Sequence, residues 1–548
     1  MLMILVAVLG LSSASAEAGK RETSKGMRPT THRDRPITGV NTEAAPEDAV
    51  KAKPVLAYDP DLDAANEQAL APQNPPTSGG VSPTAAAGVV NSSFFGMQQV
   101  PSNQLGWGYP PDTSLAASSS RVVQAVNRRV RLSNTTGGHL MTMTLDGFFK
   151  GVDGLQLFDP KVYYDRNSSR PRHYIVALEG ASSGFSRLHL AVSRSTDPST
   201  LAPGAWCRYS FDARVPVAGN AATWADYPGL GMGQTALTLS TNQFSDTGSF
   251  RYTALWALNK LQVSNNASAC PSISRYNWKA NATLGDFSRF TVQPVQHYTN
   301  PSSYPSVGVN YPAYFVNTLR GTGSYYRVWR IINIGASSPL LQSTFVYGNF
   351  SYSIPPRGPG GQNPSTGAAA TIDNGDTRVL QGAGLGNHLY AAHGTGCQFT
   401  GGAVESCARY VAIDVGTATN GAMTVALRQQ ATNGGGDGWY YSYPGVAVNN
   451  NGAVASAFVV ESVGGYQSSA YGTKTYTQAN FPSESFLLQG TCLNNATYQA
   501  DRGYNRAGDY TGAQTAPDGT SFWVSAERAT AISGVGCGWQ TLVARVSA

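Results

Sequence analysis

Tyr443-Pro-Gly-Val-Ala-Val448 joins a turn residue and a proline to a short run of small and apolar residues, the pattern of a turn leading into a buried strand. Six other segments have the same pattern, each with an Asp or Tyr anchor and often with Pro. In chain order the seven segments are Pro111-Asp-Thr-Ser-Leu-Ala116, Asp159-Pro-Lys-Val-Tyr-Tyr164, Asp226-Tyr-Pro-Gly-Leu-Gly231, Tyr304-Pro-Ser-Val-Gly-Val309, Asp376-Thr-Arg-Val-Leu380, Tyr443-Pro-Gly-Val-Ala-Val448 and Asp509-Tyr-Thr-Gly-Ala513. Their anchors lie 47 to 78 residues apart. This repetition indicates a chain built from similar structural units.

The residues between the anchors form short β-type runs bounded by Gly, Pro, Asn, Asp or Ser, and amphipathic helical windows are almost absent. A four-stranded propeller blade needs about 40 to 45 residues, so each repeat can hold one blade and additional loop residues. We therefore predict an all-β fold, a single β-propeller of seven four-stranded blades, with six or eight blades as the alternatives. A strand within residues 88–97 is expected to pair with the terminal strand 539–546, which would leave no open sheet edge there.

The overall composition is that of a globular, turn-rich chain. Of the 548 residues, 41% are hydrophobic and 13% are charged, with 60 Gly, 31 Pro and 28 Tyr. Because average proteins contain about 25% charged residues, a disordered polyampholyte, a coiled coil and a helical bundle are all disfavoured. The net charge of +6 is modest and spread along the chain, so we expect no binding to nucleic acid or to a membrane surface.

The N-terminal region differs from the rest of the chain. Residues 1–16 combine an apolar core with a small-residue end, which predicts a signal peptide. Residues 17–87 are rich in charge, Pro, Gly, Ser and Thr and poor in aromatic residues, which predicts a disordered stalk or propeptide. The propeller domain is expected to span residues 88–548. No second long apolar run follows, so we predict a secreted or cell-surface protein without a transmembrane anchor.

Six cysteines, an even number in a chain predicted to be exported, indicate disulfides and not metal ligands. Six cysteines allow about fifteen pairings. Sequence order favours Cys207 with Cys270, Cys397 with Cys407, and Cys492 with Cys537. Asn-x-Ser/Thr sequons are also present, which allows a glycoprotein, but they occur at about the frequency that composition predicts by chance.

Several motifs resemble those of secreted sialidase-like β-propellers. They are PPDTSLAASSSRVVQAVN (110–127), FDPKVYYD (158–165), LHLAVSRSTDP (188–198), WADYPGLG (224–231), GDYTG (508–512) and PDGTSFW (517–523), and the resemblance covers about residues 105–548. Asp197 before Trp206 and Asp518 before Trp523 lie in segments similar to degenerate Asp-boxes, which in that superfamily are turn elements and not catalytic. The resemblance implies the propeller fold. The Arg-Ile-Pro signature of true sialidases is absent, so sialic-acid chemistry is not implied.

If the anchors begin the innermost strands, their side chains face one another at one mouth of the axial channel. The resulting ring would consist of Asp112, Asp159, Asp226, Asp376 and Asp509, completed by Tyr304 and Tyr443. Such a ring could bind Ca²⁺ through carboxylate oxygens, carry out acid/base chemistry, or hydrogen-bond the hydroxyls of a sugar. The structural alternative is that each Asp accepts backbone N–H bonds that hold its turn. No other cofactor or metal is indicated.

Aromatic residues in loops or at strand ends are candidate stacking surfaces for sugars or proteins. Trp224, Trp439 and Tyr443 are the rings we expect to be accessible, and with the mouth residues they make up the predicted ligand-binding set. The leading hypothesis is an exported, non-enzymatic, monomeric propeller that binds a glycan or an extracellular protein. Adhesion or association with a cell wall would be its role.

The competing hypothesis is a glycoside hydrolase or lyase that uses the axial mouth. Its acid, base or nucleophile would come from Asp159, Asp226, Asp376 and Asp509, and Arg378 would orient an anionic group. Propeller enzymes commonly use this position, but a shared fold does not establish a shared function. A third hypothesis is a structural coat component, which predicts self-association. The sequence contains no intact catalytic signature, which favours binding over catalysis.

Overall fold

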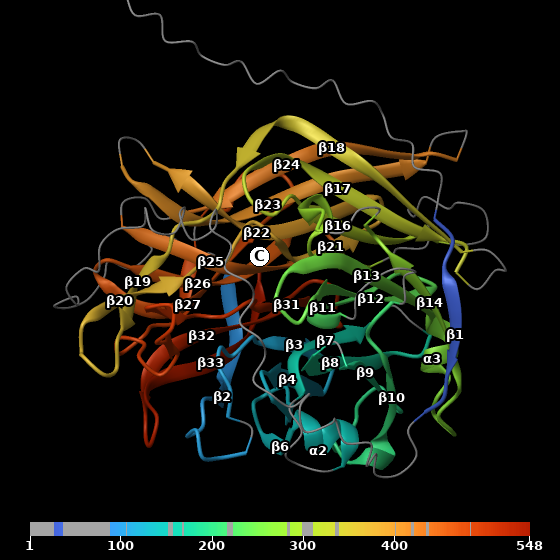
Figure 1. Cartoon of the computed structure of the whole chain (residues 1–548), viewed down its shortest axis with the longest axis horizontal. Helices are drawn as coiled ribbons and strands as arrows, with labels where there is room; N and C mark the ends of the chain where they lie inside the picture. Colours follow the sequence, from blue (N-terminus) through green and yellow to red (C-terminus); the bar gives the residue numbers. More distant parts are fainter. Residues whose placement is uncertain are drawn as a thin grey trace, which may run out of the picture.

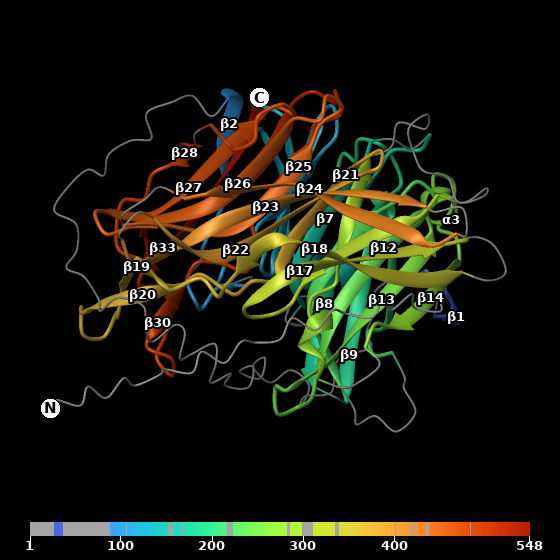
Figure 2. The ribbon, with the colours of Figure 1, turned by 90° about the horizontal axis from the view of Figure 1, so that it is seen from above.

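The computed structural model describes residues 27–36 and 88–548, except residues 106, 152–156, 167–168, 183, 216–222, 282–284, 299–310, 335–338, 400–401, 418–420, 435–437 and 483. The described part is nearly all β-structure, as Figures 1 and 2 show, and the predicted all-β class is confirmed. Its short helical elements are α2 (Leu145–Lys150), α3 (Lys260–Ser264), η2 (Pro203–Ala205) and η3 (Phe287–Arg289). Neither α2 nor α3, the α-helices of the described part, is long and apolar enough to cross a membrane.

Consecutive strands pair antiparallel in sets of four. Three sets are separate sheets: β3 (Ser114–Ala117), β4 (Arg121–Val126), β5 (Arg129–Asn134) and β6 (His139–Thr144); β7 (Leu157–Asp165), β8 (Arg172–Ser182), β9 (Phe185–Ser193) and β10 (Trp206–Asp212); and β25 (Trp439–Val448), β26 (Val454–Ser462), β27 (Gly465–Lys474) and β28 (Glu484–Leu488). This is the strand organisation that short β-runs separated by turn residues predict.

Three further sets lie within a larger sheet. They are β11 (Trp224–Met232), β12 (Ala236–Phe244), β13 (Phe250–Asn259) and β14 (Ile273–Lys279); β15 (Gln293–Tyr298), β16 (Ala313–Thr318), β17 (Gly323–Ile332) and β18 (Leu340–Tyr352); and β21 (Val379–Leu385), β22 (His388–Gln398), β23 (Val404–Thr417) and β24 (Met423–Asn433). Parallel pairing of β15 with β11 and with β21 joins these sets into one sheet.

Another sheet combines the beginning and the end of the region 88–548. It consists of β31 (Gly512–Thr515), β32 (Phe522–Ile532), β33 (Gly536–Ser547) and β2 (Val89–Gln98). β2 pairs antiparallel with β33, from Val89 opposite Ser547 to Gln98 opposite Gln540. The pairing expected between these two segments is therefore present.

The first strands of the sets lie side by side around an axis. β3 contacts β7, and the contacts continue through β11, β15, β21, β25 and β31, which in turn contacts β3. In Figure 1, β3, β7, β11 and β31 lie near the middle of the molecule, whereas β6, β10 and β14 lie farther out. Sheets arranged radially in this way form a β-propeller.

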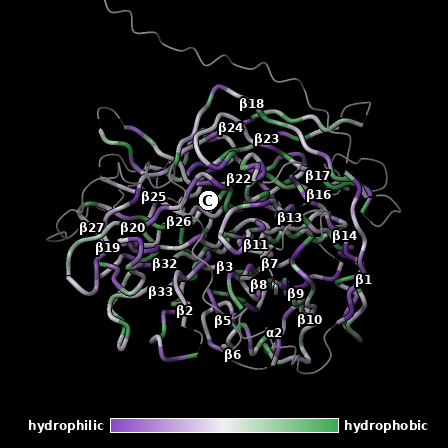
Figure 3. Tube along the Cα trace, in the orientation of Figure 1, coloured by the Kyte–Doolittle hydropathy of each residue, from purple (hydrophilic) through white to green (hydrophobic). Residues whose placement is uncertain are grey.

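Close packing at the axis explains the small residues that follow the anchors. A Cβ atom built on Gly229 would lie 2.3 Å from Cδ of Pro294 on β15, so a larger residue would separate the first strands of two sets. Apolar side chains fill the space between neighbouring sheets. Figure 3 shows apolar and polar residues interspersed along the strands, as expected when each strand presents alternate residues to opposite faces.

Two elements are added to the sets of four. β19 (Gly358–Gln362), β20 (Ala369–Asp373), β29 (Tyr498–Gln499) and β30 (Tyr504–Arg506) form a small sheet from the segments that precede β21 and β31. β1 (Thr30–Asp34) pairs antiparallel with β14. Residues 27–36 thus differ from the predicted disordered arm, while the signal peptide and the rest of the arm lie outside the described residues.

The three disulfides follow sequence order, so the predicted pairing is confirmed. Cys207 on β10 bonds to Cys270, Cys397 on β22 bonds to Cys407 on β23, and Cys492 bonds to Cys537 on β33. Each bond ties a strand of the propeller to a neighbouring segment. Three such bonds fit a secreted or extracellular protein.

Candidate functional site

Backbone kinks lie at or beside four of the predicted anchors, just before or within the first strands. Asp112, Asp159, Tyr227 and Tyr443 have positive φ values of 47°, 51°, 56° and 53°. This left-handed conformation is costly for residues with a Cβ atom, and Asp is one of the types that adopts it more readily. Before β15 the corresponding kink is at Thr291, with φ 50°, and the predicted anchor Tyr304 lies outside the described residues.

The acidic residues of the predicted ring lie at this end of the propeller, where four of them are buried. Asp112, Asp159, Asp226 and Asp376 are between 0 and 4% exposed, whereas the Asp509 side chain is 21% exposed. A carboxylate that acts on a substrate must be able to reach it, so burial argues against a catalytic role for four of the five Asp residues.

Hydrogen bonds to these carboxylates connect the anchors of different sets. Asp112 accepts from Nδ2 of Asn127 at 2.8 Å and from the backbone N–H of Asp509 at 2.7 Å. Asn127 in turn accepts from the backbone N–H of Asp159 at 3.0 Å. Asp226 accepts from the N–H of Tyr227 at 2.9 Å. These bonds match the structural alternative, in which the Asp side chains hold turns.

Asp376 is neutralised by two arginines. Arg378 donates to both of its carboxylate oxygens, at 2.7 and 2.6 Å, and Arg320 donates to Oδ2 at 3.0 Å. Although burial favours the neutral acid, the charge and hydrogen bonds of Arg378 and the charge of Arg320 hold the pKa of Asp376 well below its usual range. Arg378 also lies 4.6 Å from the ring centre of Tyr227. Its guanidinium is thus engaged within the protein, contrary to the idea that it orients an anionic substrate.

Lys161 places a third cation at the axis, and the sequence did not mark it. Its ammonium lies 2.8 Å from the ring centre of Tyr510, a cation–π contact. Burial lowers the pKa of Lys161 to about 7, although the negative charges of Asp112, Asp159 and Asp509 oppose this change. Its position in the sequence could have predicted this place, because Lys161 directly follows the Asp159-Pro160 anchor and alternate side chains of the first strand point to the axis.

Three tyrosines fill the space between these charged groups. The hydroxyls of Tyr227, Tyr443 and Tyr510 donate to the carbonyl oxygens of Asp509, Asp373 and Pro160 at 2.8, 2.9 and 3.0 Å. Burial raises the pKa of all three well above its usual value. They are neutral hydrogen-bond donors, and their bonds tie neighbouring sets of strands together at the axis.

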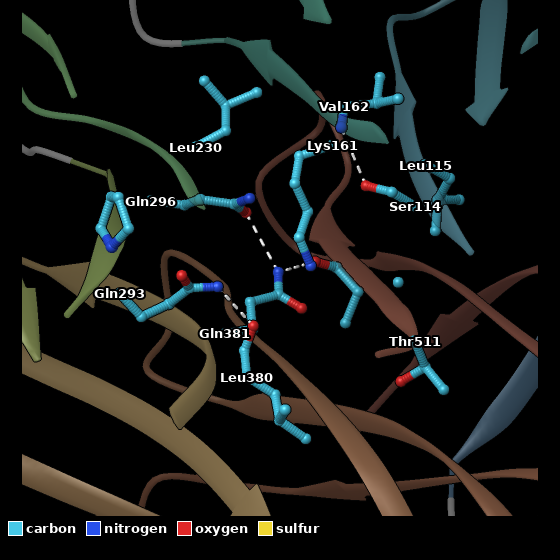
Figure 4. A pocket seen from close by; sticks show the side chains of 13 residues that line it. Ser114, Leu115, Lys161, Val162, Leu230, Gln293, Gln296, Leu380, Gln381 and Thr511 are labelled. Carbon is cyan, nitrogen blue, oxygen red and sulfur yellow. Dashed lines mark hydrogen bonds between the residues drawn. The ribbon is translucent and has the colours of Figure 1, made fainter. Parts of the chain in front are cut away.

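A cavity lies on the axis beside Lys161, as Figure 4 shows. The centre of a water molecule can move in about 20 Å³ of it. Gln381 spans the cavity by donating to the carbonyl of Ala513 at 2.6 Å and to Oε1 of Gln296 at 3.2 Å, and Gln293 donates to the carbonyl of Leu380 at 2.6 Å. This volume holds about one water molecule, whereas drug-sized ligands need about 300 Å³ or more. The cavity is thus too small for a sugar ring.

Two of the rings expected to be accessible are buried. Trp224 is 0% exposed and donates from Nε1 to the carbonyl of Ser245 at 2.9 Å, and Tyr443 is 2% exposed. The expectation of exposure is wrong for both, because each ring completes the packing beside a kink or a strand end. Trp439 is half-buried, with its ring centre 6.0 Å from that of Phe486.

An open aromatic surface lies instead on β17 and β18. Tyr325, Phe345 and Tyr347 occupy one face of this strand pair, and we call these three residues the aromatic ladder. Tyr347 is 63% exposed, and Tyr325 and Phe345 are half-buried. Tyr325 lies opposite Tyr347, and the ring centre of Phe345 is 5.2 Å from Tyr325 and 5.8 Å from Tyr347. The sequence showed Tyr325 beside Tyr326 but gave no sign that residues 345 and 347 share its face.

Buried side chains hold the ladder in place. The guanidinium of Arg327 lies between the ring of Trp329, at 4.3 Å, and the ring of Phe345, at 4.6 Å. Arg327 also donates to the hydroxyl of Ser343 at 2.8 Å. Trp329 is fully buried, so the row of stacked groups runs from the core to the solvent. Rings held in this way lose little conformational entropy when a ligand binds.

No group of three or more His, Cys, Asp or Glu side chains is arranged to hold a metal ion within the part of the chain that the structure describes. At the axial mouth the carboxylates of Asp112 and Asp376 are directed to protein donors. The suggested calcium site at the mouth would compete with these bonds.

Comparison with known proteins gave fold likenesses only. No protein-family model matches the chain, and no curated protein matches it. A Dos1 propeller has 10% identity and a TM-score of 0.31, over 79% of this chain and 78% of that one. The α-L-arabinanase of Penicillium chrysogenum, in complex with arabinobiose, has 10% identity and a TM-score of 0.32, over 84% of this chain and 98% of that one. A Trypanosoma rangeli sialidase has 9% identity and a TM-score of 0.32, over 79% of this chain and 59% of that one. At this level of similarity we argue function from the site alone.

Proposed function

We propose that the chain is an exported, non-enzymatic β-propeller that binds a glycan through the aromatic ladder. The observation that carries this proposal is the ladder itself, a row of half-exposed and exposed rings supported from the core by Arg327 and Trp329. Aromatic faces stack on the apolar faces of sugar rings, and the apolar area that each contact removes from water favours binding.

We further propose seven blades in a closed ring. Seven sets of four antiparallel strands in the described residues support this number, counting β2 with β31 to β33. The pairing of β2 with β33 supports closure by the two ends of the domain, which protects the edges of both strands. The three disulfides and the apolar residues 1–16 support export.

The competing glycosidase hypothesis has less support. An inverting or retaining glycosidase needs two carboxyl groups that both reach the scissile bond. Asp159, Asp226 and Asp376 are buried, and Asp376 is held by Arg378 and Arg320. Asp509, the most exposed of the candidates, forms an ion pair with Arg506.

The experiment is a panel of insoluble polysaccharides incubated with the full chain, followed by assays for retained protein and for released soluble fragments. The proposal predicts retention on at least one polymer without fragments. Release of fragments by the parent chain would establish the glycosidase instead, and retention that survives Tyr347→Ala combined with Phe345→Ala would place the binding site elsewhere. Tyr476→Ala, which removes a 43% exposed tyrosine that is not one of the three ladder residues, is the matched control.

A further inference from the structure

The outer edge of one four-stranded set is occupied by a strand from far away in the sequence. β1 pairs antiparallel with β14 at five consecutive positions, from Thr30 opposite Asn277 to Asp34 opposite Ile273. β14 would otherwise be an edge strand with unpaired N–H and C=O groups. The pairing is thus a β-strand addition, in which main-chain bonds give affinity and side chains give register.

Contacts at both ends of the segment 27–34 fix this register. Asp34 accepts two hydrogen bonds from Arg275, at 2.8 and 3.3 Å, and the two side chains are 13% and 5% exposed. A bidentate and largely desolvated pair of this kind is more specific than a surface ion pair. Arg275 is oriented by the ring of Phe211 below it, at 4.3 Å.

The second anchor is Met27. Its backbone exchanges two hydrogen bonds with Leu341 on β18, at 2.9 and 3.1 Å, and its carbonyl accepts from Nε1 of Trp278 at 3.0 Å. Its side chain packs against the apolar cluster that contains Trp278 and Leu341. The contacts with β14 and β18 at both ends of the segment 27–34 are therefore all made by residues of that segment.

The tether between this segment and the rest of its own chain is long and its ends lie far apart. Fifty-one residues, 37–87, separate the two described parts of the chain. Gly88, which directly precedes β2, lies beside Ser547, whereas β1 lies on β14. Figures 1 and 2 both show β1 and β2 on different sides of the molecule. A chain of this length reaches at most about 170 Å, enough to reach either its own β14 or that of an adjacent molecule.

We propose that residues 27–36 and the β14 edge are a donor and an acceptor through which copies of this chain join one another. The contacts made in cis are available unchanged in trans, because none of them involves β2 or the tether. Each copy offers one donor and one acceptor at different places, a head-to-tail arrangement that produces rings or open chains. Exchange depends on the protein concentration relative to the effective concentration of the tethered arm, which is of the order of a millimolar.

The test uses cysteine pairs placed by the observed register. Arg33 lies opposite Ser274, and the six native cysteines are all in disulfides. The full chain is prepared as Arg33→Cys in one batch and Ser274→Cys in another, and the two are mixed under mild oxidation. The double variant in one chain serves as the reference for the cis disulfide. Thermal unfolding checks that each variant folds like the parent.

Strand exchange predicts a covalent heterodimer whose initial rate of formation per chain rises about fiftyfold between about 10 µM and about 1 mM. With an effective concentration of about 1 mM for the tethered arm, the fraction of arms in trans rises from about 1% to about one half. His32→Cys mixed with Ser274→Cys is the control, because residue 32 is opposite Arg275 and adjacent strand residues point to opposite faces. Equal yields in the test and control mixtures, or a cis disulfide with no heterodimer at 1 mM, would overturn the proposal. Failure of the double variant to form its disulfide would refute the register and the proposal with it.

Discussion

Replacement of Lys161 by Met tests whether the axial mouth is a closed, structural cluster. Met keeps the length of the side chain and its contact with the Tyr510 ring, and it removes the charge. Burial lowers the pKa of Lys161 from 10.5 to about 7. A difference of one pKa unit corresponds to about 1.4 kcal/mol, so the full effect on the free energy of unfolding is about 5 kcal/mol.

The sign follows from proton binding in the two states. Between pH 7 and 10.5 the unfolded chain holds a proton on Lys161 that the folded chain has lost. The free energy of unfolding therefore rises with pH between 7 and 10.5, so the stability that the neutral Lys161 allows is present above pH 10.5 and is lost as the pH falls toward 7. From pH 7 to pH 9 the stability of the parent should rise relative to that of the Lys161→Met variant by about 2 to 3 kcal/mol.

The assay is urea unfolding followed by tryptophan fluorescence, with disulfides intact, at several pH values from 6 to 9.5. Other titrating groups cancel in the difference between parent and variant. Lys279→Met is the comparison, because burial lowers the pKa of Lys279 while leaving its side chain partly exposed, which predicts a smaller rise. If the difference in free energy of unfolding between the parent and Lys161→Met does not change with pH, the interpretation of Lys161 as a buried, desolvated ammonium is refuted.

Two further predictions concern buried carboxylates. Asp376→Asn leaves Arg378 and Arg320 without their shared anion, so it should lower the free energy of unfolding by about 3 to 5 kcal/mol. Adding Arg378→Met to this variant should restore part of the loss. Thermal unfolding of the three proteins measures both effects, and a melting temperature that Asp376→Asn leaves unchanged would contradict the ion pairs. Burial raises the pKa of Asp146 to about 7, so its contribution to stability is present below its ordinary pKa and is lost as the pH rises toward 7. In urea unfolding, the free energy of unfolding of Asp146→Asn should therefore rise relative to that of the parent by up to about 4 kcal/mol between pH 4 and pH 7.5. Parallel pH profiles of the two proteins would show that Asp146 is not desolvated.

The sequence predicted the anchors because their chemistry is local. Asp or Tyr-Pro marks four positions where the backbone turns to positive φ, and small residues follow where first strands meet at the axis; the four are Asp112, Asp159, Tyr227 and Tyr443. The anchor before β15 was missed because Thr291 carries neither signal, although its backbone has the same conformation. Disulfide pairing was predictable since each bond joins two cysteines that are consecutive in chain order.

The candidate site was less predictable because its side-chain contacts depend on the three-dimensional fold and not on the local sequence. The pattern placed the Asp residues at the mouth, but it could not show that Arg378 folds back onto Asp376 or that Lys161 lies on the Tyr510 ring. The aromatic ladder requires the register of β17 with β18, which follows from pairing and not from either segment alone. β1 is polar throughout, so its composition resembled a linker, whereas its structure depends on the edge that it covers.

Calorimetric titration of the full chain with a soluble fragment of the retained glycan tests the central claim most directly. We predict that Tyr347→Ala weakens binding by about tenfold, that Phe345→Ala has a similar effect, and that Tyr476→Ala has none. Burying an aromatic side chain contributes about 1.5 kcal/mol or more, and about 1.4 kcal/mol corresponds to a tenfold change in affinity. Equal affinity for the parent and all three variants would contradict glycan binding through the aromatic ladder.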